Sequence, residues 1–284
     1  MPALFVDDLT VIDFAYFDIH RGIVGESWIV DLVLEGELDE QGMVFDFGDV
    51  KKRIKQAIDA TVDHKFVVPA QSQHVTAEDS ESGLKLTLKD SAEGRYHHQS
   101  PTQAVVLLEA EEVTMDAVIS VLNEACLEVV PSNVAKVHLT LRTEEIEGNY
   151  YHYAHGLKKH LGDCQRIAHG HRSQIHIFDN GQRSTKLESF WCKKWKDIYI
   201  GTEEDLVEPE VENPDDYYRF AYTSEQGYFS LELPKARCHI MQSDSTVELI
   251  ATHILTQLKA IEPHATIQVK AFEGVNKGAI ANDF

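Results

Sequence analysis

Three stretches of the chain place apolar residues three and four positions apart, the spacing of a helix with one buried face. The first begins at Val50, and Asp49 before it is expected to cap its start. The second and third follow Thr114 and Thr246, whose side chains are expected to cap them in the same way. The inward-facing positions are Ile54, Ala57, Ile58 and Val62 in the first helix, Met115, Val118, Ile119 and Leu122 in the second, and Val247, Ile250 and Ile254 in the third.

Other runs alternate in polarity or are rich in β-branched residues, which predicts strands. Strands are expected at residues 28–34, 105–108, 137–141, 174–178 and 267–271. Residues 39–42, Asp-Glu-Gln-Gly, have the composition of a hairpin turn. Phe190, Trp191 and Trp195 are expected to cover the core rather than to stack on a ligand.

Two parts of the sequence resemble each other in order and spacing, which indicates an internal repeat. Residues 24–32 match residues 169–177, and residues 14–16 match residues 153–155. Each part then continues to a threonine-capped helix and a strand. We therefore predict two diverged copies of one β–β–α–α–β unit, residues 1–148 and residues 149–284.

Each predicted copy also contains a polar segment without clear periodicity. Residues 206–216 are acidic and include Pro209 and Pro214, so they are expected to form an exposed, irregular loop. Residues 78–99 are expected to be the polar counterpart of this loop in the first copy.

The composition is that of a globular protein with a real core, since 43% of the 284 residues are hydrophobic. The formal net charge is −21, and such a surface repels phosphate backbones, which argues against nucleic acid as a partner. No apolar run approaches the length of a membrane span, and the opening residues lack the basic start of a signal peptide. Reduced thiols and a cytoplasmic location are expected, because the cysteines form no CxxC pair: Cys126, Cys164, Cys192 and Cys238.

A cluster of histidines is the strongest chemical signal. His169 and His171 alternate around a glycine, so on a strand both side chains face the same way. His155 is expected to supply a third nitrogen from a neighbouring strand, with His160 as the alternative. Three protein ligands leave one position open, which is the pattern of a catalytic Zn²⁺ site. Cys164 lies close enough in sequence to act there as a reactive thiol, although a buried structural cysteine would fit the same position.

The order of these motifs resembles that of the 6-pyruvoyltetrahydropterin synthase and 6-carboxytetrahydropterin synthase family, which has the tunnelling fold. The family pattern is a strand histidine, Cys-x-x-x-His-Gly-His, an acidic turn, Val-x-Asp-Phe-x-x-Leu-Lys, Asp-His, Pro-Thr-x-Glu and a late glutamate. The first copy carries the acidic turn at 35–39, the Asp-Phe stretch at 43–51 and Asp63-His64. The second copy carries His155, Cys164, His169, His171, Thr246 and Glu273.

The resemblance implies a role for each of these residues. Zn²⁺ would be held by His155, His169 and His171, Cys164 would be the catalytic base, and Asp63 with His64 would relay protons. Glu273 would accept hydrogen bonds from a pterin, and Thr246 would add a hydroxyl contact. The alternative interpretations are a polar pair at a helix end for Asp63-His64 and a solvated carboxylate for Glu273.

The sequence departs from the family pattern in several places. The spacing from Cys164 to His169 is one residue longer than in the family. The first copy has Tyr16, Val24 and Glu26 at the ligand positions, and Thr143, or the nearby Glu144 or Glu145, at the position of Glu273. In the second copy, Cys238-His239 is expected at the place of the Asp-His pair, in a structural role.

The sequence therefore predicts an α+β fold with two tandem modules, whose antiparallel sheets carry helix pairs on one face. The resemblance implies that such modules close into an oligomeric barrel, as two chains in one ring or three chains in two. It also implies a zinc-dependent lyase that converts 7,8-dihydroneopterin triphosphate to 6-carboxy- or 6-pyruvoyl-tetrahydropterin, the former for deazaguanine-type (queuosine) biosynthesis. A non-catalytic pterin- or purine-binding protein is the alternative. A zinc hydrolase ranks last, because the sequence offers no obvious glutamate base near His171.

Overall fold

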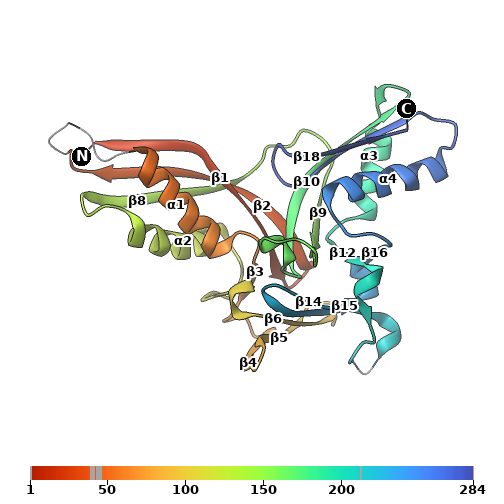
Figure 1. Ribbon diagram of the computed structural model, residues 1–284, viewed down its shortest axis with the longest axis horizontal. Coiled ribbons are helices and arrows are strands. Elements are labelled where there is room, and N and C mark those ends of the chain that lie inside the picture. Colours follow the sequence, from red (N-terminus) through yellow and green to blue (C-terminus); the bar gives the residue numbers. More distant parts are fainter. Residues whose placement is uncertain (1, 39–41, 43–46, 212, 284) are drawn as a thin grey trace.

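The computed structural model describes residues 2–38, 42, 47–211 and 213–283. Within these residues the chain forms three sheets and four α-helices, so the predicted α+β class is confirmed (Figure 1). The hairpin turn predicted at 39–42 lies outside the described residues except for Gly42, as does the motif at 43–46. The helices are α1 (Phe47–Val62), α2 (Met115–Val129), α3 (Thr185–Lys194) and α4 (Val247–Ile261).

The first sheet and two helices form one side of the molecule. Its strand order is β7-β3-β1-β2-β8. Helices α1 and α2 cover one face, where their apolar stripes pack against the inward residues of β1, β2 and β8 in a single hydrophobic core. The strands are β1 (Ala3–Asp18), β2 (Gly22–Gly36), β3 (Phe66–Pro69), β7 (Val105–Leu108) and β8 (Val134–Thr143).

The second sheet repeats this arrangement with α3 and α4 (Figure 1). Its strand order is β16-β12-β9-β10-β17-β18, and the short β11 (Gln182–Arg183) pairs with β10. The strands are β9 (Tyr150–His155), β10 (His169–Asp179), β12 (Ile198–Thr202), β16 (Cys238–Met241), β17 (Ile267–Phe272) and β18 (Gly278–Asn282). Both sheets differ from the prediction of purely antiparallel pairing, because β3, β7, β12 and β16 pair in parallel.

A third sheet joins the two halves, and it corrects the prediction of a polar loop at 78–99. The segment forms strands whose alternate residues are buried, including Leu84, Leu86, Tyr96 and His98. Strand β6 pairs with β15, so both halves contribute to one sheet and to the core beneath it. The strands are β4 (Val75–Ser80), β5 (Gly83–Lys89), β6 (Arg95–Ser100), β13 (Leu206–Val207), β14 (Tyr217–Ser224) and β15 (Gly227–Pro234).

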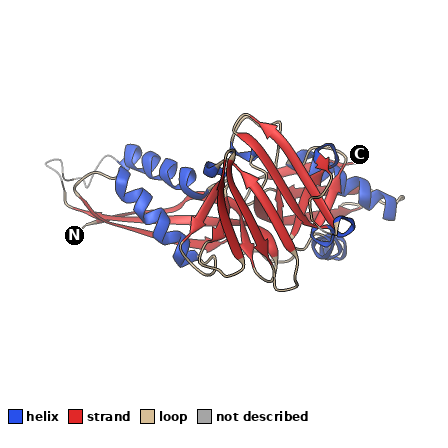
Figure 2. Cartoon of the chain, turned by 90° about the horizontal axis from the view of Figure 1, so that it is seen from below, coloured by secondary structure: helices blue, strands red, loops and turns tan. Residues whose placement is uncertain are grey.

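Residues 208–216 between β13 and β14 match the predicted acidic loop more closely. They contain one 3-10 turn, Pro214–Asp216, and their described side chains are mostly exposed. Figure 2 shows the strands of the three sheets in the middle of the molecule and the helices toward its two ends.

The hairpins β1–β2 and β9–β10 have the same register. Tyr16 lies opposite Val24 and Ala15 opposite Gly25 in the first hairpin. In the second, His155 lies opposite His169 and Ala154 opposite Gly170. These are the pairs that the sequence alignment of the two halves matched.

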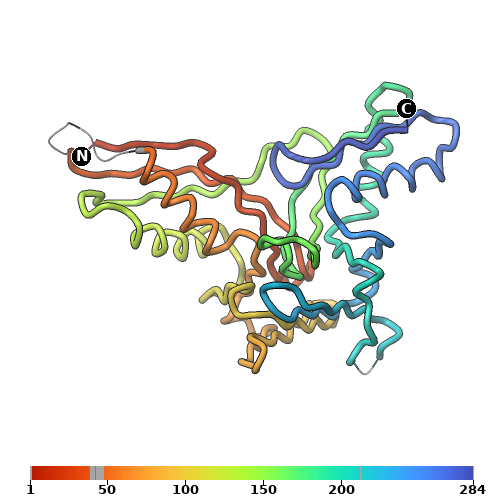
Figure 3. The backbone as a smooth tube through the Cα atoms, in the orientation of Figure 1, coloured from red at the N-terminus to blue at the C-terminus, as the bar shows by residue number. Residues whose placement is uncertain are grey.

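The two hairpins cross in contact at the centre of the molecule (Figure 3). Two glycines make this approach close. A Cβ atom on Gly25 would lie 1.8 Å from the carbonyl oxygen of Tyr153, and one on Gly170 would lie 2.6 Å from the Cα of Gly25. The crossing therefore brings residues of the first half against the histidine motif of the second.

Several local predictions can be judged directly. Thr114 and Thr246 cap α2 and α4 by accepting hydrogen bonds from the backbone N–H groups three residues on, those of Ala117 and Leu249, as predicted. Asp49 does not stand at the predicted position just before α1, because the helix begins at Phe47 and Asp49 lies in its first turn, paired with Arg53.

The expected core aromatics divide in two. Trp191 and Trp195 are fully buried, whereas Phe190 is 44% exposed.

All four cysteines are free. None of the helices in the described part of the chain is both long and apolar enough to cross a membrane.

Candidate metal centre

The structure brings together the three histidines of the predicted zinc site. His155 ends β9, and His169, the first residue of β10, lies directly opposite it, with His171 two residues further along β10. All three side chains are buried, and one ligand nitrogen from each lies within 4.8 Å of the other two. His160, the alternative third ligand, instead accepts a hydrogen bond at Nδ1 from the backbone N–H of Gly162.

The Nδ1 atom of each imidazole lies beside a neighbouring oxygen, with hydrogen-bond geometry for His155 and His169 and an ion-pair contact alone for His171. His155 Nδ1 lies 3.0 Å from the carbonyl and the hydroxyl oxygens of Ser245, and His169 Nδ1 donates to the Arg166 carbonyl at 3.0 Å. His171 Nδ1 lies 3.2 Å from a carboxylate oxygen of Asp13. A carbonyl partner requires a proton on Nδ1, which leaves the lone pair on Nε2.

These residues fit a zinc ion on two counts. The buried Nε2 atoms of His155 and His171 have no hydrogen-bond partner, and such orphaned atoms are costly unless a ligand satisfies them. Burial first, and the neighbouring imidazoles second, hold the pKa of His155 and of His169 well below the usual histidine value. Neutral imidazoles are the form that binds a metal ion.

A second group shares His169 with the first. His64, Cys164 and His169 also place one ligand atom each within 4.8 Å of the others. Cys164 lies in a 3-10 turn, Asp163–Gln165, and its carbonyl accepts the N–H of Leu157, which closes the loop between β9 and β10. The extra residue before His169 is accommodated in this loop, and the Cys164 sulfur still reaches the ring of His64.

His64 has a backbone and a side chain held by the first half of the chain. It follows α1 with a positive φ of 54°, and its N–H donates to the carbonyl of Asp13. Its Nδ1 lies 2.7 Å from the Asp63 carboxylate. Burial alone lowers the pKa of His64, but hydrogen bonds to Asp63 and Cys164 outweigh burial and raise it to about 10.

Asp13 connects the two groups, and the sequence analysis did not identify it. Its carboxylate contacts His171 and accepts from Ser27 and Lys277, while its N–H donates to Asp63. Burial alone would raise its pKa, but these neighbours, His171 above all, hold the pKa well below its usual range. The available signal was a single acid flanked by apolar residues within a strand, which is rare without a partner.

Replacing Asp13 by asparagine is expected to weaken zinc binding about 10- to 100-fold, because the carboxylate that orients His171 is lost. A competition titration against a zinc chelator measures this. Asp7→Asn, on the exposed part of the same strand, is the control and should leave affinity unchanged. Equal affinity of the Asp13 variant and the unmodified protein would contradict the role of Asp13.

The turn after β17 delivers Glu273 to the same place. A carboxylate oxygen of Glu273 lies 3.9 Å from Nε2 of His171, and its side chain is 26% exposed. Gly274, at φ 71°, follows it, and a Cβ atom there would lie 2.4 Å from the Asp13 carboxylate. Thr246 is occupied as a helix cap, next to the Ser245 that contacts His155.

The structure does not bring Cys238-His239 to the position expected for it. His239 lies on β16 and meets His253, with 2.8 Å between their Nε2 atoms. The residue equivalent to His64 is instead Asp197, because β12 pairs with β9 in the register in which β3 pairs with β1. Both residues have a positive φ, of 54° and 52°.

The first half holds different groups where the second holds its histidines. By register, Tyr16, Val24 and Glu26 are equivalent to His155, His169 and His171. Arg21, in the turn between the strands, donates to the Tyr16 hydroxyl and forms an ion pair with Asp197. Thr143, opposite Trp28, has the register that matches Glu273, so this half has no carboxylate at the matching position.

Replacing Glu26 by glutamine is expected to stabilise the protein at alkaline pH. Burial raises the pKa of Glu26 to about 7, despite a hydrogen bond from the Ser27 N–H that lowers it. The fold therefore favours the protonated carboxyl of Glu26. The free energy of unfolding falls as the pH rises from about 4.5 through 7, because the buried carboxyl must then lose its proton. The glutamine variant should gain up to about 3 kcal/mol at pH 8 and nothing at pH 4.5.

Denaturant unfolding at the two pH values measures the Glu26 effect. Glu248→Gln on exposed α4 is the control, with a change below about 0.5 kcal/mol at both values. A gain that did not depend on pH would contradict a buried, titrating Glu26.

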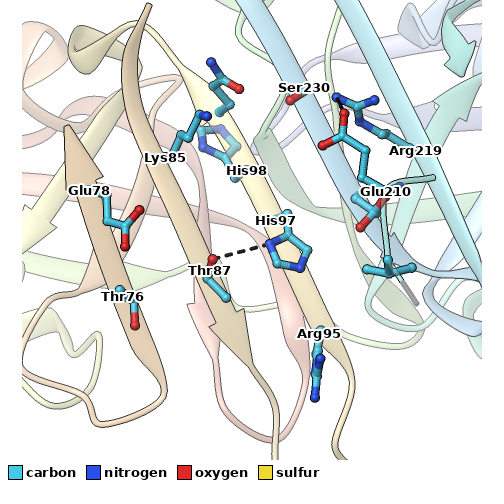
Figure 4. A pocket seen from close by; sticks show the side chains of 13 residues that line it. Thr76, Glu78, Lys85, Thr87, Arg95, His97, His98, Glu210, Arg219 and Ser230 are labelled. Carbon is cyan, nitrogen blue, oxygen red and sulfur yellow. Dashed lines mark hydrogen bonds and ion pairs between the residues drawn. The ribbon is translucent and has the colours of Figure 1, made fainter. Parts of the chain in front are cut away.

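The histidine cluster does not line the cavity shown in Figure 4. That cavity, of about 390 Å³, lies on one face of the third sheet, with side chains that include Lys85, Arg95, His97, Arg219 and Glu232. None of its residues belongs to either group of candidate metal ligands found in the described part of the chain. The histidines instead approach the surface beside Cys164, His64 and Glu273, which are each partly exposed.

Known proteins resemble parts of this chain. Residues 18–117 match the family model described as 6-pyruvoyl tetrahydropterin synthase. A protein of Pyrococcus abyssi named "Putative 6-carboxy-5,6,7,8-tetrahydropterin synthase" is 27% identical over 124 residues, which cover 42% of this chain and 67% of that protein.

Two solved structures are also similar to parts of the chain. The 6-pyruvoyltetrahydropterin synthase of Plasmodium vivax has 18% sequence identity and a TM-score of 0.39, over 50% of this chain and 97% of that one. The Plasmodium falciparum enzyme has 16% identity and a TM-score of 0.40, over 49% and 90%. The family match at residues 18–117 confirms what the motifs predicted: this chain resembles the 6-pyruvoyl tetrahydropterin synthase family.

Proposed function

We propose that the protein is a zinc-dependent pterin lyase that acts on 7,8-dihydroneopterin triphosphate. The observation that carries this proposal is the meeting of two groups from different halves of the chain. Three buried imidazoles, of which His155 and His171 have Nε2 atoms without a hydrogen-bond partner, adjoin a thiol and a histidine–aspartate pair. An open three-histidine site next to a base and a proton relay is suited to moving protons next to a hydroxyl or carbonyl.

His155, His169 and His171 would hold the zinc ion. When bound, zinc acidifies substrate hydroxyls and stabilises negative charge on their oxygens. Cys164 would remove the proton from the substrate side chain, with the ring of His64 beside its sulfur. Asp63 fixes the orientation of His64, so that Nε2 of His64 faces the thiol and can exchange a proton with it.

Glu273 would hold the pterin ring. Its carboxylate lies beside the cluster and is partly exposed, so it can accept two N–H bonds from an aminopyrimidine edge. Thr246 would contribute a hydroxyl contact, although in this structure its oxygen accepts the N–H of Leu249.

We also propose that residues 1–148 and 149–284 are two modules of one repeated fold. The equal hairpin registers support this division, as does the order of five corresponding strands, to which the second sheet adds β18 and β11. The unpaired edges of the sheets favour closure into a barrel with further copies of the chain, in the cytoplasm. A second chain would cover the exposed side of the site, near Glu273 and Cys164.

Turnover of 7,8-dihydroneopterin triphosphate tests the lyase. Formation of 6-pyruvoyl-tetrahydropterin releases triphosphate alone, whereas 6-carboxytetrahydropterin requires the release of triphosphate and acetaldehyde. The zinc-loaded protein should form one of these products, and His64→Gln should lower kcat by about 100-fold or more. The proposal fails if stoichiometric, zinc-loaded protein releases neither triphosphate nor acetaldehyde, and unchanged turnover in His64→Gln removes the relay.

The alternative is a protein that binds pterins or purines without converting them. The departures of the first half favour it, since Tyr16, Val24 and Glu26 cannot form the same metal site. Binding of 7,8-dihydroneopterin with full recovery of the unchanged triphosphate substrate would select this alternative.

A further inference from the structure

A cavity of about 420 Å³ opens beside the charged groups that replace the metal centre in the first half. Arg21, from the β1–β2 turn, forms one wall. The start of β9 forms a second wall, and α3 with the residues after it forms a third. Asp197, the equivalent of His64, and His152, the equivalent of Asp13, both line it. The cavity is therefore related to the metal centre by the repeat but has different chemistry.

The lining is cationic in a chain whose net charge is −21. Arg21, Lys193 and Lys196 contribute three positive charges, and Asp197 is the single acid among the lining residues. Asp197 is already paired with Arg21 at 2.5 Å. Within the described ranges, Lys193 and Lys196 form no ion pair with an acidic side chain, so their charges remain available to a ligand.

One aromatic side chain stands at the rim of the site, and a second forms its buried floor. Tyr151 is 2% exposed and packs against Tyr153 and Trp195 in the core behind the cavity. Tyr150 is 43% exposed at the rim, and the guanidinium of Arg172 lies 4.2 Å from the centre of its ring. An attached ring could therefore stack on Tyr150 while an anionic group occupies the cationic wall.

We propose that this cavity binds a phosphorylated small molecule, with its phosphate oxygens held by Lys193, Lys196 and Arg21. Phosphate chains carry several negative charges, which match three cations better than a single carboxylate does. The site is independent of the metal centre, and the proposal does not rest on the lyase reaction.

Calorimetric titration of the full chain with inorganic triphosphate, at low ionic strength, tests the site. The double variant K193Q/K196Q is expected to lose at least tenfold in affinity. The matched control K51Q/K52Q removes two exposed lysines from α1, in the other arm of the molecule, and should bind as tightly as the unmodified protein (Figure 1). A titration with ATP shows whether a ring beside Tyr150 adds affinity to that of the phosphates.

Three results would overturn the proposal. They are binding of neither probe at millimolar concentration, equal binding by K193Q/K196Q, and an equal loss in K51Q/K52Q, which would indicate general electrostatic attraction. The variant H171A separates this site from the metal centre. It should keep triphosphate binding whether or not the chain is a lyase, and loss of binding in H171A would assign the anion to the metal centre instead.

Discussion

Replacing His171 by alanine is expected to abolish stable zinc binding, with a loss of affinity of more than about 100-fold. The substitution removes one of three ligands, which exceeds the 10- to 100-fold cost of losing only an orienting partner. It also leaves the buried carboxylate of Asp13 without its imidazole. Elemental analysis after gel filtration should fall from about one zinc per chain to near zero, and lyase turnover should fall with it.

His176→Ala is the matched control for this variant. His176 lies on the same strand, β10, but outside both groups of candidate ligands. It is expected to keep full zinc content and full turnover. If His171→Ala retained one zinc per chain, the three-histidine site would be wrong, and the group of His64, Cys164 and His169 would become the candidate instead.

Gly25→Ala is expected to destabilise the protein by about 3 kcal/mol or more. The new Cβ would lie 1.8 Å from the Tyr153 carbonyl oxygen and 2.5 Å from the backbone nitrogen of His171. Neither contact can be relieved by rotating a side chain, so the two hairpins must separate. Denaturant unfolding measures the loss, and zinc affinity should fall as well because the separation displaces His171.

Gly181→Ala provides the comparison for Gly25→Ala. Gly181 has a φ of 80°, but no atom lies within 4 Å of the position of its Cβ. The expected cost is the backbone strain alone, about 1 kcal/mol, without an effect on zinc. Gly25 itself has no positive φ, so a cost for Gly25→Ala no larger than that for Gly181→Ala would contradict the close crossing of the hairpins.

The features that local sequence predicted are those in which the deciding partners lie close together in the chain. Thr114 and Thr246 cap their helices because a hydroxyl and an N–H three residues on are adjacent whatever the rest of the fold does. The placement of His169 and His171 on one face follows from the pleat of a single strand. The position of His155 could also be predicted, because a hairpin brings its two strands side by side and so places His155 opposite His169.

The strands of the third sheet could not be predicted from local sequence. Residues 95–100 alternate between exposed and buried positions, but the buried ones include His98 and Ser100, which hide the apolar pattern. Their burial depends on β15, which pairs with β6 from the other half of the chain. A polar composition therefore suggested a loop where long-range pairing makes a strand.

The sequence by itself predicted three of the four described helices, five of the strands and the three histidines that the structure brings together, because local periodicity and spacing carry these features. Only the tertiary structure decided that Asp13 orients His171, that Cys164 reaches His64 despite its longer loop, and that Asp197 rather than His239 is the counterpart of His64. Each of these contacts joins residues far apart in the chain. The crossing of two hairpins at Gly25 and Gly170 creates them, and no local pattern records where two hairpins cross.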